Sequence, residues 1–350
     1  MTRILAIETS CDETAAAVVE DGHLVLSDPV ATQIDIHRKY GGVVPELASR
    51  NHVVDIVPVV NDALEQADCT WTDIDAIAVT QGPGLVGALL VGIQVAKALA
   101  YAQKKPLIPV HHLAGHLHAV FLHKPGEERP EGPQWPNVAL AVSGGHTALY
   151  LAQAPGEVTQ LANTRDDAAG EAFDKVARML GLGYPGGPIV EKMAKGGDTK
   201  AHRFTPPRFK DGGFDFSFSG LKTAVLTAIK KHEGPSPLPQ GEDLRNLLAS
   251  FQYAAVTQLV QRTVDAAVKH GVKDVVLAGG VACNSVLRTT LSNHLVGRGM
   301  KLHVPRPRWC TDNAAMIGGV AYNAAKIRLN EPNLEADRKL NAIASWRLDR

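Results

Sequence analysis

The sequence predicts an α/β protein built from two copies of one unit, and the order of its segments carries this prediction. Short apolar runs typical of buried strands alternate with longer segments of helical periodicity along the 350 residues. A strand, a polar turn and a second strand at residues 4–19 return at residues 138–151. A strand, a glycine turn and a helix at residues 76–100 return at residues 275–291. Because the order repeats with low residue identity, we interpret the halves as a duplicated mixed α/β unit.

The first copy is expected before residue 125. Its strands are predicted at residues 4–8, 15–19, 24–26, 75–80 and 105–109. Pro45 suits the first turn of a helix over residues 46–66, where proline loses no helical hydrogen bond. Further helices are expected over residues 85–100 and through the histidine-rich stretch 110–119.

Residues 125–136 are rich in proline, glycine and charge, and are the best candidate for a linker. Beyond them the pattern restarts, and residues 302–304 followed by a helix at 311–325 repeat the strand and histidine-rich helix of the first copy. The predicted domains are residues 1–133, joined by a C-terminal helix at about 326–350, and residues 134–325.

Three leading strands followed by strand–helix units, duplicated, are the plan of the actin, sugar-kinase and heat-shock-chaperone ATPase superfold. In that fold two RNase H-like domains face each other, and glycine turns from both line the cleft between them. The predicted fold class is therefore α/β, with two RNase H-like domains and a cleft between them.

Net charge gives no indication of a nucleic-acid partner, because 36 lysines and arginines balance 36 acidic residues. Contacts with RNA phosphates would need local basic clusters. The candidates are Lys200, His202, Arg203, Arg208 and Lys210, and later Arg298, Lys301, Arg306 and Arg308. Simple solvation is the alternative interpretation of both clusters.

Four scattered cysteines without C-x-x-C spacing indicate free thiols in a reducing compartment. No secretory signal is recognised at the start, where a strand and then acidic residues follow at once. The most apolar segment, residues 84–102, contains Gln94 and Lys97, so we expect a buried helix and no membrane span. A cytoplasmic location is the expectation.

Four of the fourteen histidines fall within residues 111–118. On a helix, His112 and His116 are one turn apart on one face, with Cβ atoms about 6 Å apart. Two imidazoles at that distance can share a transition-metal ion, although such pairs also occur on solvated helix faces. The zinc-protease pattern H-E-x-x-H does not apply, because Leu113 stands where its glutamate would be.

A third ligand has to come from elsewhere in the chain. The pseudo-symmetry of the duplicated fold places the start of the helix at residues 311–325 opposite the histidine-rich helix. Asp312 is therefore expected to point across the cleft at His112 and His116. A helix-capping role for Thr311 or Asp312 is the alternative.

Nine motifs occur in order and together resemble a known family. They are I-E-T-S-C-D-E-T, G-G-V-V-P-E-L-A-S-R, V-H-H-L-A-G-H, V-S-G-G-H-T, D-D-A-A-G-E-A-F-D-K, Y-P-G-G-P, D-F-S-F-S-G-L-K-T, A-G-G-V-A-C-N and C-T-D-N. They are similar to the bacterial TsaD family, which transfers threonylcarbamoyl to tRNA adenosine. The resemblance covers residues 4 to about 325, with Leu113-Ala114 departing from the Met-Glu frequent in the family.

The resemblance implies a metal centre and a substrate site. His112, His116 and Asp312 match the family's metal ligands, for Fe²⁺ as the first choice and Zn²⁺ as the second. The matches to contacts with threonylcarbamoyl-adenylate are Ala141, Val142, Ser143, Gly144, Gly145, Asp174, Gly187 and Asn284, with Glu191 as a neighbour at the ribose. Besides tRNA, the implied partners are a smaller paralogue, TsaB, as heterodimer, the ATPase TsaE and a synthase of the TsaC type, with no membrane.

The chemistry of the residues agrees with this resemblance. The exocyclic amine of adenine is a weak nucleophile and needs an activated acyl donor, such as a carbamoyl-adenylate that releases AMP. Backbone amides of glycine turns can approach a phosphate without side-chain obstruction, although each turn alone would be ordinary. Asp12 or Glu13, after the first strand, can take the proton of the amine, with turn formation or capping as the alternative.

Two other functions remain open from the sequence. One is an ATPase or kinase of the same superfold, which would turn over ATP alone. The other is a metallopeptidase, which the missing glutamate disfavours.

Overall fold

The computed structural model describes residues 1–205, 213–234, 236–330, 337 and 339–349. The chain divides into two compact units. The first comprises Met1–Gly132 together with Pro305–Arg350, and the second comprises Pro133–Val304.

The first unit is built on a six-stranded mixed sheet. Its central path runs in the order β3-β2-β1-β5-β6, with β4 pairing to β2. Strand β2 is antiparallel to β1, whereas β5 and β6 continue the sheet in parallel. The strands are β1 (Arg3–Glu8), β2 (Glu13–Glu20), β3 (Leu24–Ser27), β4 (Val30–Thr32), β5 (Ala76–Gly82) and β6 (Leu107–His111).

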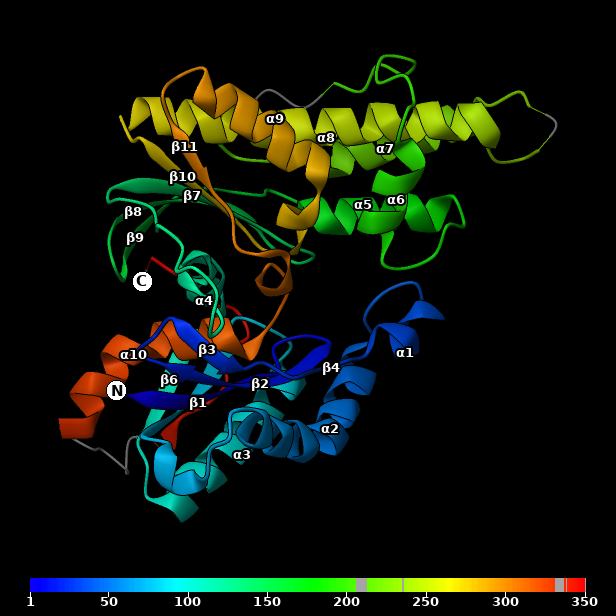
Figure 1. Cartoon of the computed structure of the whole chain (residues 1–350). Helices are drawn as coiled ribbons and strands as arrows, with labels where there is room; N and C mark the ends of the chain where they lie inside the picture. Colours follow the sequence, from blue (N-terminus) through cyan, green and yellow to red (C-terminus); the bar gives the residue numbers. More distant parts are fainter. Residues whose placement is uncertain (206–212, 235, 331–336, 338, 350) are drawn as a thin grey trace. The chain divides into compact units, whose positions relative to one another are not determined.

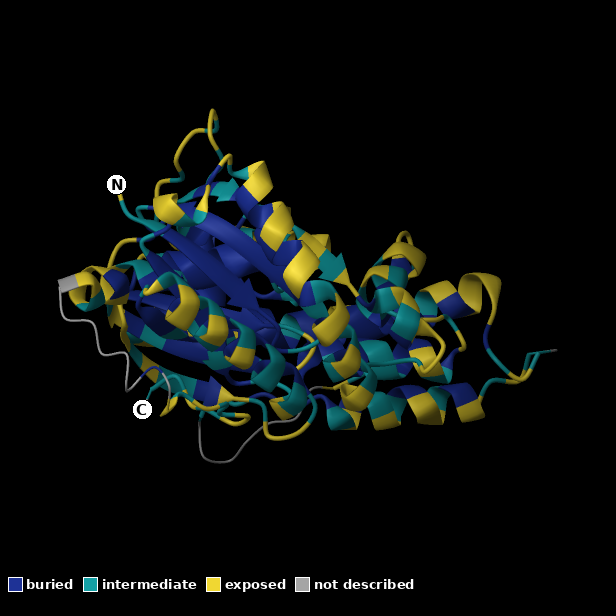
Figure 2. Cartoon of the chain, turned by 90° about the horizontal axis from the view of Figure 1, so that it is seen from below, coloured by how far each residue is buried: buried dark blue, intermediate teal, exposed yellow. Residues whose placement is uncertain are grey.

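Helices cover both faces of this sheet (Figure 1). Alternate residues of a strand point to opposite faces. Ile4 and Ala6 of β1 therefore pack on one face with α10, and Leu5 and Ile7 pack on the other with α2 and α3. The helices are α1 (Ile34–Arg38), α2 (Pro45–Gln66), α3 (Val86–Gln103), α4 (His112–His118) and α10 (Ala314–Asn330), with 3₁₀ turns at Trp71–Asp73, Ala119–Phe121 and Pro307–Trp309. Figure 2 shows the strands buried beneath helices whose outer sides are exposed.

The apolar helix expected at residues 84–102 is α3. Among the described residues it is the one helix long and apolar enough to cross a membrane by length and composition. It packs on β5 and on α2, and Leu89, Ile93 and Ala96 belong to the buried cluster on that face of the sheet. Its apolar character is thus used in the core of the first unit.

The second unit has a five-stranded sheet in the order β11-β10-β7-β8-β9. Its strands are β7 (Asn137–Val142), β8 (Thr147–Ala154), β9 (Glu157–Asn163), β10 (Asp274–Ala278) and β11 (Lys301–His303). Its helices are α5 (Ala169–Met179), α6 (Gly186–Ala194), α7 (Ser219–Lys230), α8 (Gly241–Lys269) and α9 (Ser285–Val296), with a 3₁₀ turn at Gly280–Cys283.

The predicted duplication is confirmed by the two sheets. Each has three leading strands in antiparallel order, followed by two strands that add in parallel beside the first. Strands β7, β8, β9, β10 and β11 thus take the places of β1, β2, β3, β5 and β6.

The unit boundary differs from the expected one at its C-terminal side. Residues 305–325, expected in the second domain, belong to the first unit. Helix α10 follows β11 in the chain but packs on β1, β2, β5 and β6. The reason is that its buried residues, among them Met316 and Ile317, cover the face of the first sheet opposite α2 and α3. Of the helix expected at about residues 326–350, α10 accounts for the part up to Asn330, residues 331–336 and 338 lie outside the described residues, and residues 340–349 are not helical.

Candidate metal centre and substrate site

Three predicted metal ligands lie together in the first unit. Oδ1 of Asp312 is 3.5 Å from Nε2 of His112 and 3.2 Å from Nε2 of His116. The two imidazole rings meet edge to face, with centroids 4.7 Å apart. One ligand atom from each residue can be chosen so that all three lie within 4.8 Å of one another. Two imidazoles and one carboxylate at this spacing are a donor set suited to a divalent transition metal.

The arrangement of α4 and α10 produces this cluster. Strand β6 ends at His111, and α4 begins at His112, so both histidines of the pair lie on the first two turns of one helix. A Cβ on Gly115 would lie only 2.9 Å from Met316 Cγ and 3.0 Å from Ile317 Cδ1. The glycine therefore permits the close approach of α10 that brings Asp312 to the histidines.

One expectation about Asp312 needs correction. The pseudo-symmetry argument places it in the domain opposite the histidines, but Asp312 belongs to the same unit, because α10 packs on the first sheet. The start of α10 is capped by Asn313, whose Oδ1 accepts a hydrogen bond from Met316 N at 2.9 Å. Asp312 is thereby left available as a ligand.

Sequence reasoning missed Glu8, the last residue of β1. Its Oε2 accepts hydrogen bonds from Nδ1 of His112 at 3.0 Å and from Thr80 Oγ1 at 2.6 Å. Its Oε1 accepts from the Ser10 amide at 2.5 Å. A carboxylate on the far nitrogen of a ligating histidine fixes the ring and its tautomer. The sequence signal was the glutamate at the end of an apolar strand, just before the acidic turn.

The charges of this buried group are strongly coupled. Burial alone would lower the pKa of His112, but the Asp312 and Glu8 carboxylates outweigh it and hold that pKa well above its ordinary value. Burial would likewise raise the pKa of Asp312, yet His112 and then His116 hold it well below the usual range. The pKa of Glu8 is lowered, because His112 outweighs the effect of burial.

His116 provides an observation that fits a bound cation. Its side chain is 1% exposed, and neither ring nitrogen has a hydrogen-bond partner among the described residues. Buried polar atoms are nearly always satisfied, so an Nε2 that lies 3.2 Å from Asp312 Oδ1 without the geometry of a hydrogen bond indicates a missing ligand. The residues present therefore fit a divalent metal ion.

The two predicted acids lie in the first unit, where Asp12 ends the turn after β1 and Glu13 is the first residue of β2. The Asp12 carbonyl accepts a hydrogen bond from Gln33 N, and Thr32 Oγ1 donates to Glu13 Oε1 at 3.4 Å. Burial, and then the negative charges of Asp12 and Asp312, raise the pKa of Glu13 to about 9. Without a cation, Glu13 is thus protonated at neutral pH, and a nearby positive charge would favour the ionised form that can accept a proton.

The predicted substrate residues lie in the second unit, where three loops meet. Residues 141–145 end β7 and begin the turn to β8. Gly279 has φ +92°, and a Cβ there would overlap the carbonyl oxygen of Val142. Gly170 N, at the start of α5, donates to Ser143 O at 3.2 Å. Glycines thus bring the backbones after β7 and β10 and at the start of α5 into contact.

The other predicted substrate residues extend this arrangement and are already hydrogen bonded. Asn284 caps α9, with Oδ1 accepting from Leu287 N at 2.9 Å, and its Nδ2 donates to Gln252 Oε1 at 3.0 Å. Oε1 of Glu191 accepts from the amide and hydroxyl of Ser285, next to Asn284. Oδ1 of Asp174 accepts from Gly186 N at 2.7 Å, beside Gly187. These side chains therefore shape the loops in addition to any contact with a ligand.

The predicted basic clusters divide into engaged and open residues. Arg306 and Arg308 both pair with Glu127, so one carboxylate offsets one of their two positive charges. His202 and Arg203 line a cavity of about 620 Å³ beside α7 and α8, together with Lys231 and His232. Arg208 and Lys210 lie outside the described residues.

The fold and the site define an α/β protein of the actin and sugar-kinase superfold with a candidate metal centre. HypF of T. kodakarensis has the same fold over 96% of this chain and 48% of its own, with a TM-score of 0.61 at 17% identity. The model of the tRNA N6-adenosine threonylcarbamoyltransferase family, TsaD, matches residues 24–319 of this chain. The enzyme of that name from Anaeromyxobacter sp. (strain Fw109-5) is 54% identical over 99% of this chain and 100% of its own length. The enzyme of the same name from Anaeromyxobacter dehalogenans (strain 2CP-C) is 55% identical over 99% of this chain and 100% of its own length.

The chain belongs to the TsaD family and is therefore a transferase. The predicted family and fold class are both confirmed. The roles of the individual site residues remain predictions.

Proposed function

We propose that this chain transfers threonylcarbamoyl from threonylcarbamoyl-adenylate to a tRNA adenosine. The acceptor is the exocyclic N6 amine of the adenosine 3′ of the anticodon in tRNAs that read codons beginning with A. The observation that carries the proposal is full-length identity above 50% with enzymes named for this reaction. The buried His112, His116 and Asp312 cluster adds a donor set suited to such a transfer.

In the proposed reaction the N6 nitrogen bonds to the carbamoyl carbon, and the bond from that carbon to the phosphate oxygen breaks, so that AMP leaves. The amine proton goes to Asp12 or Glu13. A divalent ion held by His112, His116 and Asp312, Fe²⁺ first and Zn²⁺ second, would supply a Lewis acid that orients the donor. The amides of residues 141–145 offer hydrogen bonds to its phosphate without side-chain obstruction, since a Cβ on Gly144 or Gly145 would meet open space.

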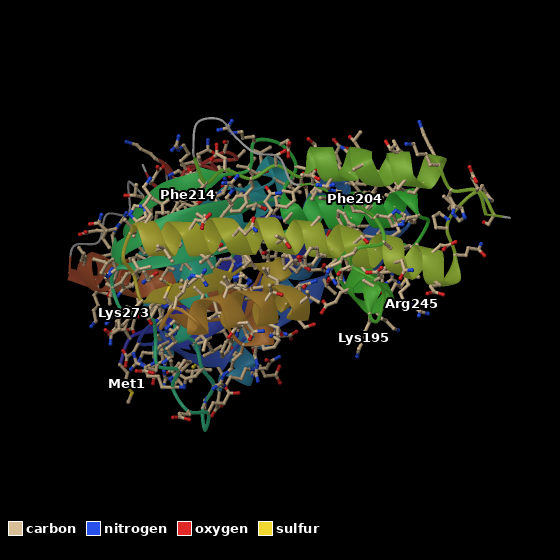
Figure 3. All side chains as sticks on the ribbon, turned by 90° about the horizontal axis from the view of Figure 1, so that it is seen from above. Met1, Lys195, Phe204, Phe214, Arg245 and Lys273 are labelled. Carbon is tan, nitrogen blue, oxygen red and sulfur yellow. The ribbon has the colours of Figure 1, made fainter. Side chains whose placement is uncertain are left out.

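The anticodon loop suits this chemistry. Loop bases can be unstacked and presented to a pocket, so the enzyme reaches the amine without melting a duplex. We place tRNA contacts at the cavity lined by His202, Arg203, Lys231 and His232, where Phe204 stacks on His202 at 5.8 Å and offers an aromatic face. Phe204 lies near the first turns of α8, and Lys273 lies at its other end (Figure 3).

A charge reversal tests this tRNA surface. Arg203→Glu should weaken tRNA binding and reduce the slope of log K against log salt, because a phosphate contact is lost. Lys273→Glu makes the same charge change at the far end of α8 and should leave both quantities unchanged. Equal effects of the two variants would contradict a localised contact.

The proposed partners are TsaB, in a heterodimer, the ATPase TsaE and a synthase of the TsaC type, in the cytoplasm. Helix α2 offers a surface for the smaller paralogue, because Val53, Val54 and Val57 are each more than half exposed on one stretch of helix. Val54→Glu should then abolish co-elution with that paralogue in size-exclusion chromatography. A complex of unchanged stability would move the interface elsewhere.

Reconstitution tests the function as a whole. Purified chain, its partners, donor and tRNA should give N6-threonylcarbamoyladenosine by nucleoside mass spectrometry. Absence of that nucleoside together with fast turnover of ATP alone would favour an ATPase or kinase. Fast peptide hydrolysis would favour a metallopeptidase, which Leu113 in the glutamate position of H-E-x-x-H disfavours.

A further inference from the structure

Residues near the end of the chain lie along the last residues of β5 and the loop that follows it. The Ile343 amide donates to Gln81 O at 2.9 Å, and the Gly84 amide donates to Ala344 O at 3.2 Å. Gln81 Nε2 also donates to the Asn341 carbonyl at 2.9 Å. A Cβ on Gly82 would overlap the Ile343 carbonyl oxygen, so only glycine permits this approach. We name residues 340–349 the C-terminal strap.

Near its end the strap contacts β6, the strand that leads into α4. The rings of Trp346 and His111 have centroids 4.7 Å apart and are tilted by 49°. Nε2 of His111 lies 3.2 Å from the Trp346 carbonyl oxygen. His111 is the last residue of β6 and directly precedes the candidate ligand His112.

The other nitrogen of the His111 ring caps the start of α4. Nδ1 of His111 accepts a hydrogen bond from the Leu113 amide at 3.1 Å, as the N-cap of the helix. Because Nδ1 accepts here, the neutral ring carries its proton on Nε2 and donates it to the Trp346 carbonyl. The two hydrogen bonds therefore select one tautomer and one orientation of His111.

A cap matters unusually for this helix. Helix α4 has only seven residues, and so short a helix is marginal without its cap and packing. The first turn of α4 carries His112, whose Nε2 must face Asp312 to share an ion. Movement of the cap would therefore shift the ligand.

We propose that Trp346 is a positioning residue for the metal ligand His112, acting through the capping ring of His111. This inference rests on the proposed metal centre. The strap thus forms part of the support of the site, although its residues are more than 200 positions from His112 in the sequence.

The test uses the full chain and Co²⁺ as the probe ion. Trp346→Ala should weaken Co²⁺ binding about tenfold and alter the visible absorption of the bound ion, as loss of an outer support does at other metal sites. Trp346→Phe keeps an aromatic ring and the same backbone carbonyl, and should restore most of the affinity. Arg347→Ala, a strap residue that pairs with Asp349, is the matched control and should behave as wild type.

A second readout does not need the metal. Amide hydrogen exchange in α4 of the metal-free protein should become faster in Trp346→Ala and stay unchanged in Arg347→Ala. In a His111→Ala background the further change Trp346→Ala should have little additional effect on Co²⁺ affinity or on hydrogen exchange. The reason is that the His111 ring, which connects Trp346 to the start of α4, is already absent.

The outcomes separate this proposal from the proposed metal centre. Unchanged Co²⁺ affinity and spectrum in Trp346→Ala, or additive effects of the two substitutions, would overturn the positioning role while the metal centre stands. Wild-type protein that binds no Co²⁺ would overturn the metal centre, and the positioning role with it.

Discussion

Oε2 of Glu8 accepts a hydrogen bond from Nδ1 of His112 at 3.0 Å, and both side chains are almost completely buried. The contact joins the end of the first strand to the start of α4, residues 104 positions apart. It leaves Nε2 of His112 facing Asp312 and so determines which nitrogen is free for an ion.

Replacement of Glu8 should weaken the metal centre without removing a ligand. Glu8→Gln introduces an amide beside the donors of Thr80 and Ser10, so the contact to His112 loses its charge and one donor loses its acceptor. We expect a loss of about 10- to 100-fold in Co²⁺ affinity by titration calorimetry. The control is Glu20→Gln, which removes the partner of Arg3 on β2. An affinity loss of the same size in both variants would contradict a specific role for Glu8.

The three ligands should be required together. His112→Ala or Asp312→Ala should abolish tight binding of one transition-metal ion per chain, because two remaining donors bind such ions weakly. Elemental analysis after dialysis measures the metal content. His118→Ala, on the same helix but bonded to Gly22 O, should retain the metal. Full metal content in both ligand variants would exclude this centre.

The raised pKa of Glu13 predicts a pH-dependent loss of stability in the metal-free protein. The folded state keeps the Glu13 proton up to a pKa of about 9, whereas the unfolded state loses it near the ordinary value of 4.5. Between these values the folded state binds more protons, so this group's contribution to stability falls as pH rises. Glu13→Gln should therefore raise the melting temperature at pH 8 and have little effect below pH 4.5.

Calorimetric melts of metal-free wild type and Glu13→Gln across pH 4–9 measure this effect. A difference in melting temperature that does not grow with pH would contradict it. In the assay, Glu13→Gln should also reduce turnover more than donor affinity if this residue accepts the proton, because that interaction forms in the transition state.

Asn284 should contribute to both stability and donor binding. Asn284→Ala removes the cap of α9 and the partner of Gln252, and the cap alone is worth about 1 kcal/mol of unfolding free energy. Asn284→Asp keeps the capping oxygen and should recover that stability. Urea unfolding and calorimetry with a non-hydrolysable adenylate measure the two effects. Donor affinity unchanged in both variants would restrict Asn284 to a structural role.

The sequence by itself determined most elements of the first unit, the duplication and the spacing of His112 and His116. These follow from short-range patterns, because apolar periodicity sets strand or helix and a spacing of four residues sets a shared helix face. Helix α2, expected from Pro45 to residue 66, is observed at Pro45–Gln66.

Only the tertiary structure decided which unit α10 joins, and with it the side from which Asp312 reaches the histidines. The same holds for Glu8 behind His112 and for Trp346 on His111. These contacts join residues 104 to more than 200 positions apart. They depend on how α10 and the strap pack on the first sheet. Local periodicity has no information on such packing, because the burial of one face does not specify which distant segment covers it.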